Sequence, residues 1–193
     1  MRLIIGIAGA SGVIYGIRLL EYLRAMDGVE THLVLTKTAR MNIAVETGWQ
    51  VRDVEALADV VYSNSDLGAA IASGSFRTDG MIVAACAMKT LSAIANSFAD
   101  DLIVRAADVT LKERRKLVLM PRETPLHAGH CALMSKACEL GAIIAPPMPA
   151  LYIRPQSIDD LVDHAAGRIL DLFGIATPDM QRWAGLAKAR RRD

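Results

Sequence analysis

Short apolar segments alternate with amphipathic ones along most of this chain. The clearest apolar segments span residues 2–8, 31–35, 80–86, 116–120 and 142–145. The first of them has no period-two alternation of polar and apolar residues, which is typical of a strand covered on both faces of a parallel sheet. These segments therefore predict four or five buried strands, with a minor strand at 60–62.

Helical periodicity fills the intervals between the predicted strands. Ile14, Ile17, Leu20 and Leu23 fall near one helical face. Further helices are predicted near residues 38–47, 53–58, 66–72, 88–96, 100–114, 132–140 and 157–173, with a last helix from about Pro178. Strands that alternate with helices predict an α/β fold with a doubly wound, Rossmann or flavodoxin-like parallel sheet and helices on both faces. We expect one domain over residues 1–193, with a C-terminal helical extension from about residue 176.

A glycine-containing turn follows the first predicted strand. Gly9 and Gly12 can adopt positive φ or let a ligand approach the backbone, and Ser11 is predicted to be the N-cap of the next helix. The free N–H groups at such a helix start favour an anionic or polar ligand. The glycine spacing is not G-x-G-x-x-G, and no acid follows the strand 31–35, which argues against NAD. A tight turn without a ligand is the alternative.

Composition narrows the class of protein. Of the 193 residues, 52% are hydrophobic, and nine Met accompany nine aromatic residues, which suits a subunit that buries area in an oligomer. A net charge of +1 argues against nucleic acid as a partner, and no apolar run approaches the roughly 20 residues of a membrane span. Three cysteines without a C-x-x-C pair favour a reduced, cytoplasmic protein.

The residues that follow the strands carry hydroxyl, amide and cationic groups and only one carboxylate. This composition indicates a phosphorylated ligand. Arg122 can hold phosphate and Glu123 can exchange a proton, although a surface ion pair is the alternative. Arg105 and Lys112 share one helical face with a separation of about 10 Å along the axis. They can grip phosphate together, or Lys112 can instead complement the C-terminus of its helix.

Three other groups of polar residues favour structural roles. Asp159, Asp160 and Asp163 form D-D-x-x-D, the arrangement of metal-dependent prenyl-transfer enzymes, but they follow Ser157 where acids stabilise a helix start. Cys86 is interpreted as a packing residue and not as a nucleophile. The third group is His127, His130 and Cys131. It lacks a fourth ligand at the spacing of a zinc site.

Six segments in order resemble the flavin prenyltransferases of the UbiX type, formerly described as aromatic acid decarboxylases. The resemblance covers residues 2–175 and rests on GASGVIYGIRLLEYL, SGSFRTDGMIV, CAMKTLSAIA, RAADVTLKERRKLVLMPRETPL, GAIIAPPMPALY and RPQSIDDLVDHAAGRILDLFGI. It implies a metal-independent enzyme that joins a dimethylallyl group from dimethylallyl phosphate to N5 and C6 of reduced FMN. It also implies a dodecamer with sites between subunits, and a separate decarboxylase that uses the prenylated FMN.

The resemblance assigns roles to individual positions. Glu123 matches the family's acid/base candidate, and Lys112 matches a catalytic position that binds phosphate. Ser11 matches a position near the reacting edge of the flavin. The positions that match flavin-binding residues are Gly9, Ala10, Ser11, Thr36, Ala87, Met88, Lys89, Thr90 and Arg122. Those that match the dimethylallyl phosphate site are Arg105, Lys112, Tyr152 and Arg168, with Glu46 as a less secure acidic position. Phe76 is a candidate aromatic wall for the allylic group, with core packing as the alternative.

One departure from the family pattern affects flavin binding. Ala85 and Ala87 stand where the family has Pro and Ser, so a possible hydroxyl contact to the flavin is lost. We expect this loss to weaken binding by about 1 kcal/mol.

Two other functions remain open. One is a decarboxylase of cysteinyl peptides, which leaves the phosphate-binding set without a ligand, and the other is a non-catalytic FMN carrier or partner subunit of a decarboxylase.

Overall fold

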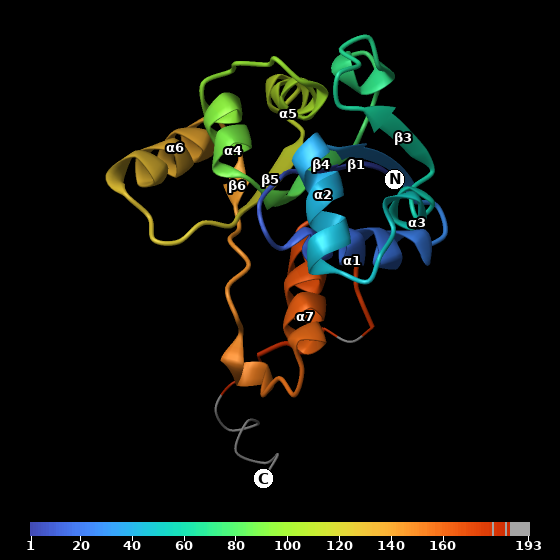
Figure 1. Ribbon diagram of the computed structural model, residues 1–193, viewed down its shortest axis with the longest axis vertical. Helices are drawn as coiled ribbons and strands as arrows, with labels where there is room; N and C mark the ends of the chain where they lie inside the picture. The colour runs from blue at the N-terminus through green and yellow to red at the C-terminus, as the bar shows by residue number, and fades with distance from the viewer. Residues whose placement is uncertain (179, 184, 186–193) are drawn as a thin grey trace. The chain divides into compact units, whose positions relative to one another are not determined.

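The computed structural model describes residues 1–178, 180–183 and 185, and a parallel β-sheet is its central element (Figure 1). Six strands form the sheet within these residues, in the order β3-β2-β1-β4-β5-β6, and every neighbouring pair is parallel. The strands are β1 (Arg2–Ile7), β2 (Glu30–Leu35), β3 (Val60–Ser63), β4 (Gly80–Cys86), β5 (Lys116–Pro121) and β6 (Ile143–Ile144). The predicted flavodoxin-like α/β fold is confirmed.

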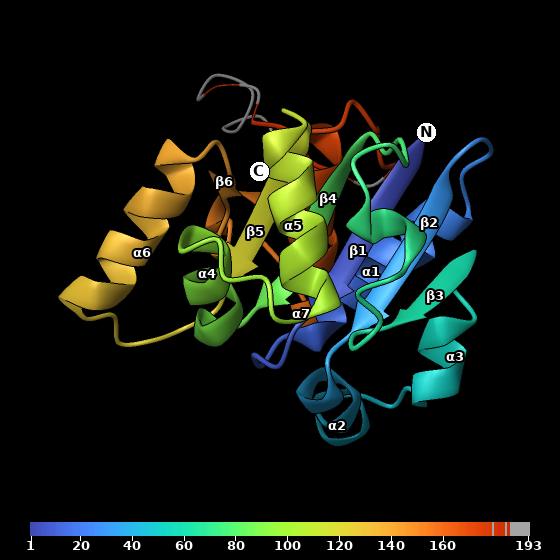
Figure 2. The ribbon, with the colours of Figure 1, turned by 90° about the horizontal axis from the view of Figure 1, so that it is seen from above.

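Helices connect successive strands, and one further helix follows the last strand (Figure 2). They are α1 (Val13–Arg24), α2 (Lys37–Glu46), α3 (Val51–Glu55), α4 (Met88–Ala95), α5 (Leu102–Lys112), α6 (Ala128–Glu139) and α7 (Ile158–Asp171), with 3-10 turns η1 (Ala70–Ala72) and η2 (Leu151–Ile153). No helix in the described part of the chain is both long and apolar enough to cross a membrane. Contacts between residues divide the chain into two compact units, Met1–Pro147 and Met148–Asp193, so a single domain over 1–193 stays a prediction.

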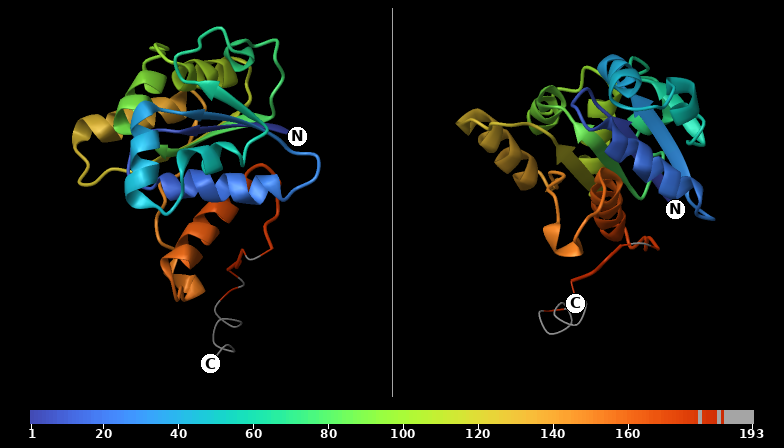
Figure 3. Two further views of the ribbon diagram at one scale, coloured as in Figure 1. Left: turned by 45° about the vertical axis from the view of Figure 1, so that its right-hand side comes forward. Right: turned by 60° about the horizontal axis from the view of Figure 1, so that its bottom comes forward.

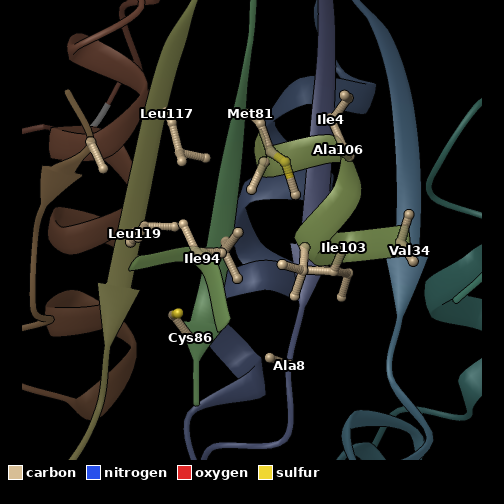
Figure 4. Packing of buried hydrophobic residues seen from close by; sticks show 14 of the residues in the cluster. Ile4, Ala8, Val34, Met81, Cys86, Ile94, Ile103, Ala106, Leu117 and Leu119 are labelled. Atoms are coloured by element: carbon tan, nitrogen blue, oxygen red, sulfur yellow. The ribbon is translucent and has the colours of Figure 1, made fainter. Parts of the chain in front are cut away.

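Both faces of the sheet are covered within the first unit. Ile103 of α5 packs against Gly6 on one face, whereas Gly16 of α1 packs against Ile7 on the other. Successive residues of a strand point to opposite faces, so α1 and α5 lie on opposite sides of β1. Figure 3 shows α1 in blue below the sheet and α5 in yellow-green above it. Figure 4 shows the core on the α5 side, where Met81, Ile103 and Leu119 are buried.

Three predicted helix ends are corrected by the structure. The N-cap of α1 is Gly12 at φ 100° and not Ser11, because the turn needs left-handed backbone and provides no side-chain cap. Helix α6 begins at Ala128, four residues before the predicted start, because His127 accepts a hydrogen bond from the Gly129 N–H and caps it. The last helix predicted from about Pro178 has no helical residue in 178, 180–183 or 185, and its remainder lies outside the described residues.

Candidate active site

The carboxyl ends of β1 and β4 meet where the strand order reverses. β2 and β3 lie on one side of β1, and β5 and β6 lie on the far side of β4. The Ala8 N–H donates a hydrogen bond of 3.0 Å to the Ala85 carbonyl, so the loops that follow these two strands are neighbours. Ligands of doubly wound sheets bind at such a reversal point. The candidate site is therefore built around these loops.

Helix α2 fixes the β1–α1 loop. Asn42 donates to the carbonyls of Gly9 and Ala10 at 3.3 and 3.2 Å, and the Gly12 N–H donates to Glu46 at 2.8 Å. Within the described residues, the N–H groups of residues 9–11 have no hydrogen-bond partner. Ser11 is exposed, and its hydroxyl is not used as a cap. The loop consequently presents a row of rigidly held donors to a ligand.

Sequence reasoning missed Asn42 and assigned Glu46 to the substrate. The structure gives both residues one task, because they are four residues apart on α2 and both bind the loop. The available signal was an Asn and a Glu four residues apart on the helix that follows the strand 31–35. Gly9 packs so closely on α2 that an added Cβ would lie 2.5 Å from the Thr38 Cβ. Only glycine fits there.

Thr36 joins β2 to α2. Its side-chain oxygen accepts a hydrogen bond of 3.0 Å from the Ala39 N–H and caps the helix, while its own N–H donates to the Ile7 carbonyl at 3.1 Å. A capping threonine accepts through one lone pair and keeps its O–H free to donate. Thr36 thus supports the loops and retains a donor for a ligand.

We expect Thr36→Val to lower the free energy of unfolding by about 1 kcal/mol, because the isosteric side chain removes the cap of α2. Urea unfolding followed by circular dichroism measures this change. Thr36→Ser is the control and should unfold like the parent. A Thr36→Val protein as stable as the parent would show that the cap contributes nothing.

The β4–α4 loop supplies a second set of donors. Ala87 is the N-cap of α4 and has no side chain that could satisfy the first N–H groups of the helix. Lys89 is exposed and Thr90 is 6% exposed at this helix start. Free N–H groups, a hydroxyl and an ammonium group together suit a phosphate. Cys86 is fully buried, and burial raises the pKa of its thiol to about 12, so its predicted packing role is confirmed.

A groove of about 670 Å³ lies at the carboxyl ends of β2 and β3 and reaches Lys89 of α4. Its charged lining comprises Lys37, Arg40, Glu55, Lys89, Asp100 and Asp101. Arg40 is paired with Glu55 at 2.6 Å, and Asp101 accepts from the Val104 N–H and caps α5. The other charged side chains of the groove are Lys37, Lys89 and Asp100, so its lining carries both signs of charge. Its volume lies in the range of small-molecule sites.

Arg122 and Glu123 follow β5 directly at the same edge. The Arg122 N–H donates to the Cys86 carbonyl at 3.4 Å, and Glu123 accepts from the Thr124 N–H at 2.9 Å. Both side chains are exposed, and they form no ion pair with each other in the described part of the chain. The structure therefore leaves both groups available for chemistry at this edge.

Lys112 lies at the opposite edge of the sheet. It is the last residue of α5, four residues before β5 begins, and it contacts Glu113 and Gly74. The six-residue strand β5 separates this edge from Glu123 by on the order of 20 Å. Arg105, earlier in α5, donates to the Ala72 carbonyl at 3.1 Å and pairs with Asp108 at 2.7 Å. One chain therefore does not bring Lys112 to the loops around Ser11.

Tyr152 and Arg168 belong to the second unit, Tyr152 on η2 and Arg168 on α7. The Tyr152 hydroxyl lies 2.9 Å from Nε2 of His164, one helical turn before Arg168. Arg168 in turn pairs with Asp171 at 2.8 Å. Sequence reasoning missed His164 and Asp171, although their spacing of three or four residues from Arg168 placed all three on one helix face.

The structure settles the roles of the other polar groups. Ser157 and Asp160 form a capping box, so the helix-start interpretation of the D-D-x-x-D segment is confirmed. Phe76 lies at the amino edge of the sheet, where the Arg2 guanidinium sits over its ring at 4.5 Å and His32 packs edge-on against it. It is partly buried against the core, and its role as an aromatic wall for the allylic group stays a prediction. His127 is a helix cap, and the described residues hold no group of three His, Cys, Asp or Glu side chains suited to a metal ion.

Comparisons with known proteins give one consistent result. The Flavoprotein family model matches residues 1–170. The flavin prenyltransferase UbiX of Escherichia coli (strain K12) is 54% identical over 186 residues, which cover 95% of this chain and 98% of that protein.

Two crystal structures share the fold and half of the sequence. A dodecameric FMN-dependent UbiX-like decarboxylase from Escherichia coli O157:H7 superposes with a TM-score of 0.95 at 51% identity, over 96% of this chain and 100% of the other. AnUbiX (PadA1), in complex with FMN and dimethylallyl pyrophosphate, superposes with a TM-score of 0.94 at 51% identity, over 95% of this chain and 97% of the other.

Proposed function

Because this chain belongs to the UbiX-type flavin prenyltransferase family, we propose that it joins a dimethylallyl group from dimethylallyl phosphate to N5 and C6 of reduced FMN. The prenylated FMN is released to a partner decarboxylase. The observation that carries this proposal is the 54% identity to a flavin prenyltransferase over nearly the whole chain. We place the reaction in the cytoplasm, in keeping with three unpaired cysteines.

The loops at the carboxyl edge of the sheet fit FMN. The row of N–H groups at residues 9–11 suits the polar edge of the flavin, and the start of α4 with Lys89 and Thr90 suits its phosphate. The residues proposed to hold FMN are Gly9, Ala10, Ser11, Thr36, Ala87, Met88, Lys89, Thr90 and Arg122. Reduced FMN supplies the nucleophilic nitrogen and carbon of the reaction.

Charged side chains are proposed to stabilise the departing phosphate. Arg105, Lys112, Tyr152 and Arg168 donate to it, which replaces the metal ion of metal-dependent prenyl transfer. Glu123 accepts the proton that ring closure releases, because its exposed carboxylate stands at the edge where the flavin loops end. Glu46 acts indirectly in this proposal, since it holds the Gly12 N–H.

We propose a homo-oligomer, a dodecamer as in the similar structure, whose sites combine residues of several subunits. Lys112 is too far from Glu123 within one chain to serve the same site, so a neighbouring subunit must supply one of them. Exposed apolar side chains support such contacts, notably Val45, which is 84% exposed, and Met41 one turn before it on α2.

Mixed oligomers test this arrangement. We expect Lys112→Ala and Glu123→Gln proteins each to be inactive, and co-expressed mixtures with separate affinity tags to recover about a quarter of the parent activity. A random 1:1 assembly gives a quarter of the sites both intact residues if these come from different subunits. Mixtures as inactive as the single variants would place both residues in the same chain.

The alternative is a carrier that binds FMN without catalysis, which Ala85 and Ala87 favour because they depart from the family pattern. An anaerobic assay separates the two: the protein, reduced FMN and either dimethylallyl phosphate or diphosphate are mixed with EDTA, and the extracted flavin is weighed by mass spectrometry. A flavin heavier by one C5 unit identifies the transferase and its preferred donor. Unmodified flavin with both donors would leave only the carrier.

A further inference from the structure

His164 is a buried histidine that the proposed reaction does not yet use. It lies on α7, is 8% exposed, and its Nε2 is 2.9 Å from the Tyr152 hydroxyl. Its ring also packs edge-on against the Tyr152 ring, with centroids 5.5 Å apart. A buried imidazole with a single aromatic hydroxyl at hydrogen-bond distance fixes both the position of that hydroxyl and the direction in which it donates.

The second ring nitrogen decides this direction. The backbone of Gln181 raises the pKa of His164, which is the effect of a carbonyl that accepts from the ring; because Nε2 faces Tyr152, we assign the proton to Nδ1. In a neutral imidazole Nε2 then has no proton and accepts from the Tyr152 O–H. In an imidazolium Nε2 donates instead, and the Tyr152 O–H is released for another acceptor. Protonation of His164 therefore switches Tyr152 between two acceptors.

We propose that His164 is a positioning residue which takes up one proton when the phosphate ester binds, so that Tyr152 donates its O–H to the phosphate. This inference rests on the proposed function, which places the phosphate at Tyr152 and Arg168. The proton comes from solvent and is bound at Nε2. The Tyr152 hydrogen bond moves from Nε2 to a phosphate oxygen, and no covalent bond of the ester breaks in this step.

The charges around His164 favour this sequence. In the free protein, burial lowers the pKa of His164, the Gln181 backbone raises it, and Arg168 lowers it, so the ring is neutral near pH 7. A phosphate dianion offsets Arg168 and favours the imidazolium. The other charged side chains facing His164 are Arg154, Asp160 and Asp163, which line a cavity of about 230 Å³ with it. Asp171 and Arg182 pair beside Arg168.

The sign of the pH dependence follows from linkage. The complex binds one more proton than the free protein, so affinity for the ester rises as pH falls, by up to about tenfold per unit. A phosphate monoester has a second pKa of about 6, and its own protonation would change affinity in the opposite direction. Between pH 6.5 and 8.5 the two effects are separable.

Calorimetric titration of the full-length protein, loaded with oxidised FMN so that no prenyl transfer follows, tests the inference with dimethylallyl phosphate as ligand. Repeating it in buffers of different ionisation enthalpy should show uptake of a proton by the parent. His164→Gln retains a hydrogen-bonding amide toward Tyr152 and should bind the ester without proton uptake and with an affinity that does not rise as the pH falls. His130→Gln, on α6, should behave like the parent.

Tyr152→Phe provides a second and independent measurement. If His164 acts through Tyr152, the double variant should bind the ester no more weakly than Tyr152→Phe does, whereas separate roles would make the losses additive. Thermal unfolding of each variant identifies any loss of fold. Proton uptake that persists in a folded His164→Gln protein would overturn the inference. Formation of prenylated FMN by the parent is measured in a separate assay. Failure of the proposed function can therefore be told apart from failure of the inference about His164.

Discussion

Glu123→Gln is expected to lower the rate of prenylated-FMN formation by about 10²- to 10⁴-fold, the range attributed to a positioned acid or base. Glutamine keeps the size of the side chain and its acceptor for the Thr124 N–H, which donates to Glu123 at 2.9 Å. It removes only the ability to hold the proton released on ring closure. Affinity for reduced FMN and thermal stability should stay at the parent values, because the side chain is exposed.

Anaerobic single-turnover reactions, quenched and weighed by mass spectrometry, measure this effect. Glu139→Gln is the matched control, since Glu139 lies at the end of α6 and binds Ser135, away from the ligand loops. It should react at the parent rate. A Glu123→Gln protein that forms the adduct within tenfold of the parent rate would remove Glu123 from the proton-transfer step.

Gly16→Ala is expected to cause a large loss of stability, about 3 kcal/mol of the free energy of unfolding. A Cβ at this position would lie 2.3 Å from the Ala84 carbonyl oxygen and 2.6 Å from Cδ1 of Ile7. The carbonyl belongs to the backbone of β4 and cannot rotate away, so α1 must lift from the sheet. FMN affinity should fall as well, because Ala85 next to it holds the β1 loop through the Ala8 N–H.

Urea unfolding and fluorescence titration of oxidised FMN measure the two effects of this substitution. Gly48→Ala is the control, because its Cβ would meet no atom within 4 Å and its φ is not in the left-handed region. It should change stability by less than about 0.5 kcal/mol. If Gly16→Ala proves as stable as Gly48→Ala, the contact between α1 and β4 is looser than the structure indicates.

Local sequence patterns predicted most of the fold. Apolar runs such as 80–86 identified the buried strands, because a strand covered on both faces needs apolar side chains in both directions. The helix start at Ser157 was recognised, since capping depends on residues three positions apart, whereas the cap at Thr36 was not and the predicted helix began near residue 38. His127 was not recognised, because histidine is an uncommon cap and a glycine follows it at 129.

The candidate site was only partly predictable. The alternation of strands and helices predicted that the loops after β1 and β4 lie close together, since all strands of a parallel sheet end at the same carboxyl edge. Arg105 and Lys112 share a helix face as predicted, but their partners come from elsewhere in the chain, including Ala72 and Gly74. The surroundings of Phe76 were not predictable for the same reason, because they depend on contacts with Arg2 and His32.

The sequence by itself determined the order of strands and helices, the family, and the residue types available for phosphate and flavin, because these depend on neighbours along the chain. Only the tertiary structure decided that Glu46 accepts from the Gly12 N–H, that Tyr152 contacts His164, and that Lys112 and Glu123 lie at opposite edges of the sheet. Each of these relations joins residues through space, where the direction of a side chain depends on the packing of whole elements.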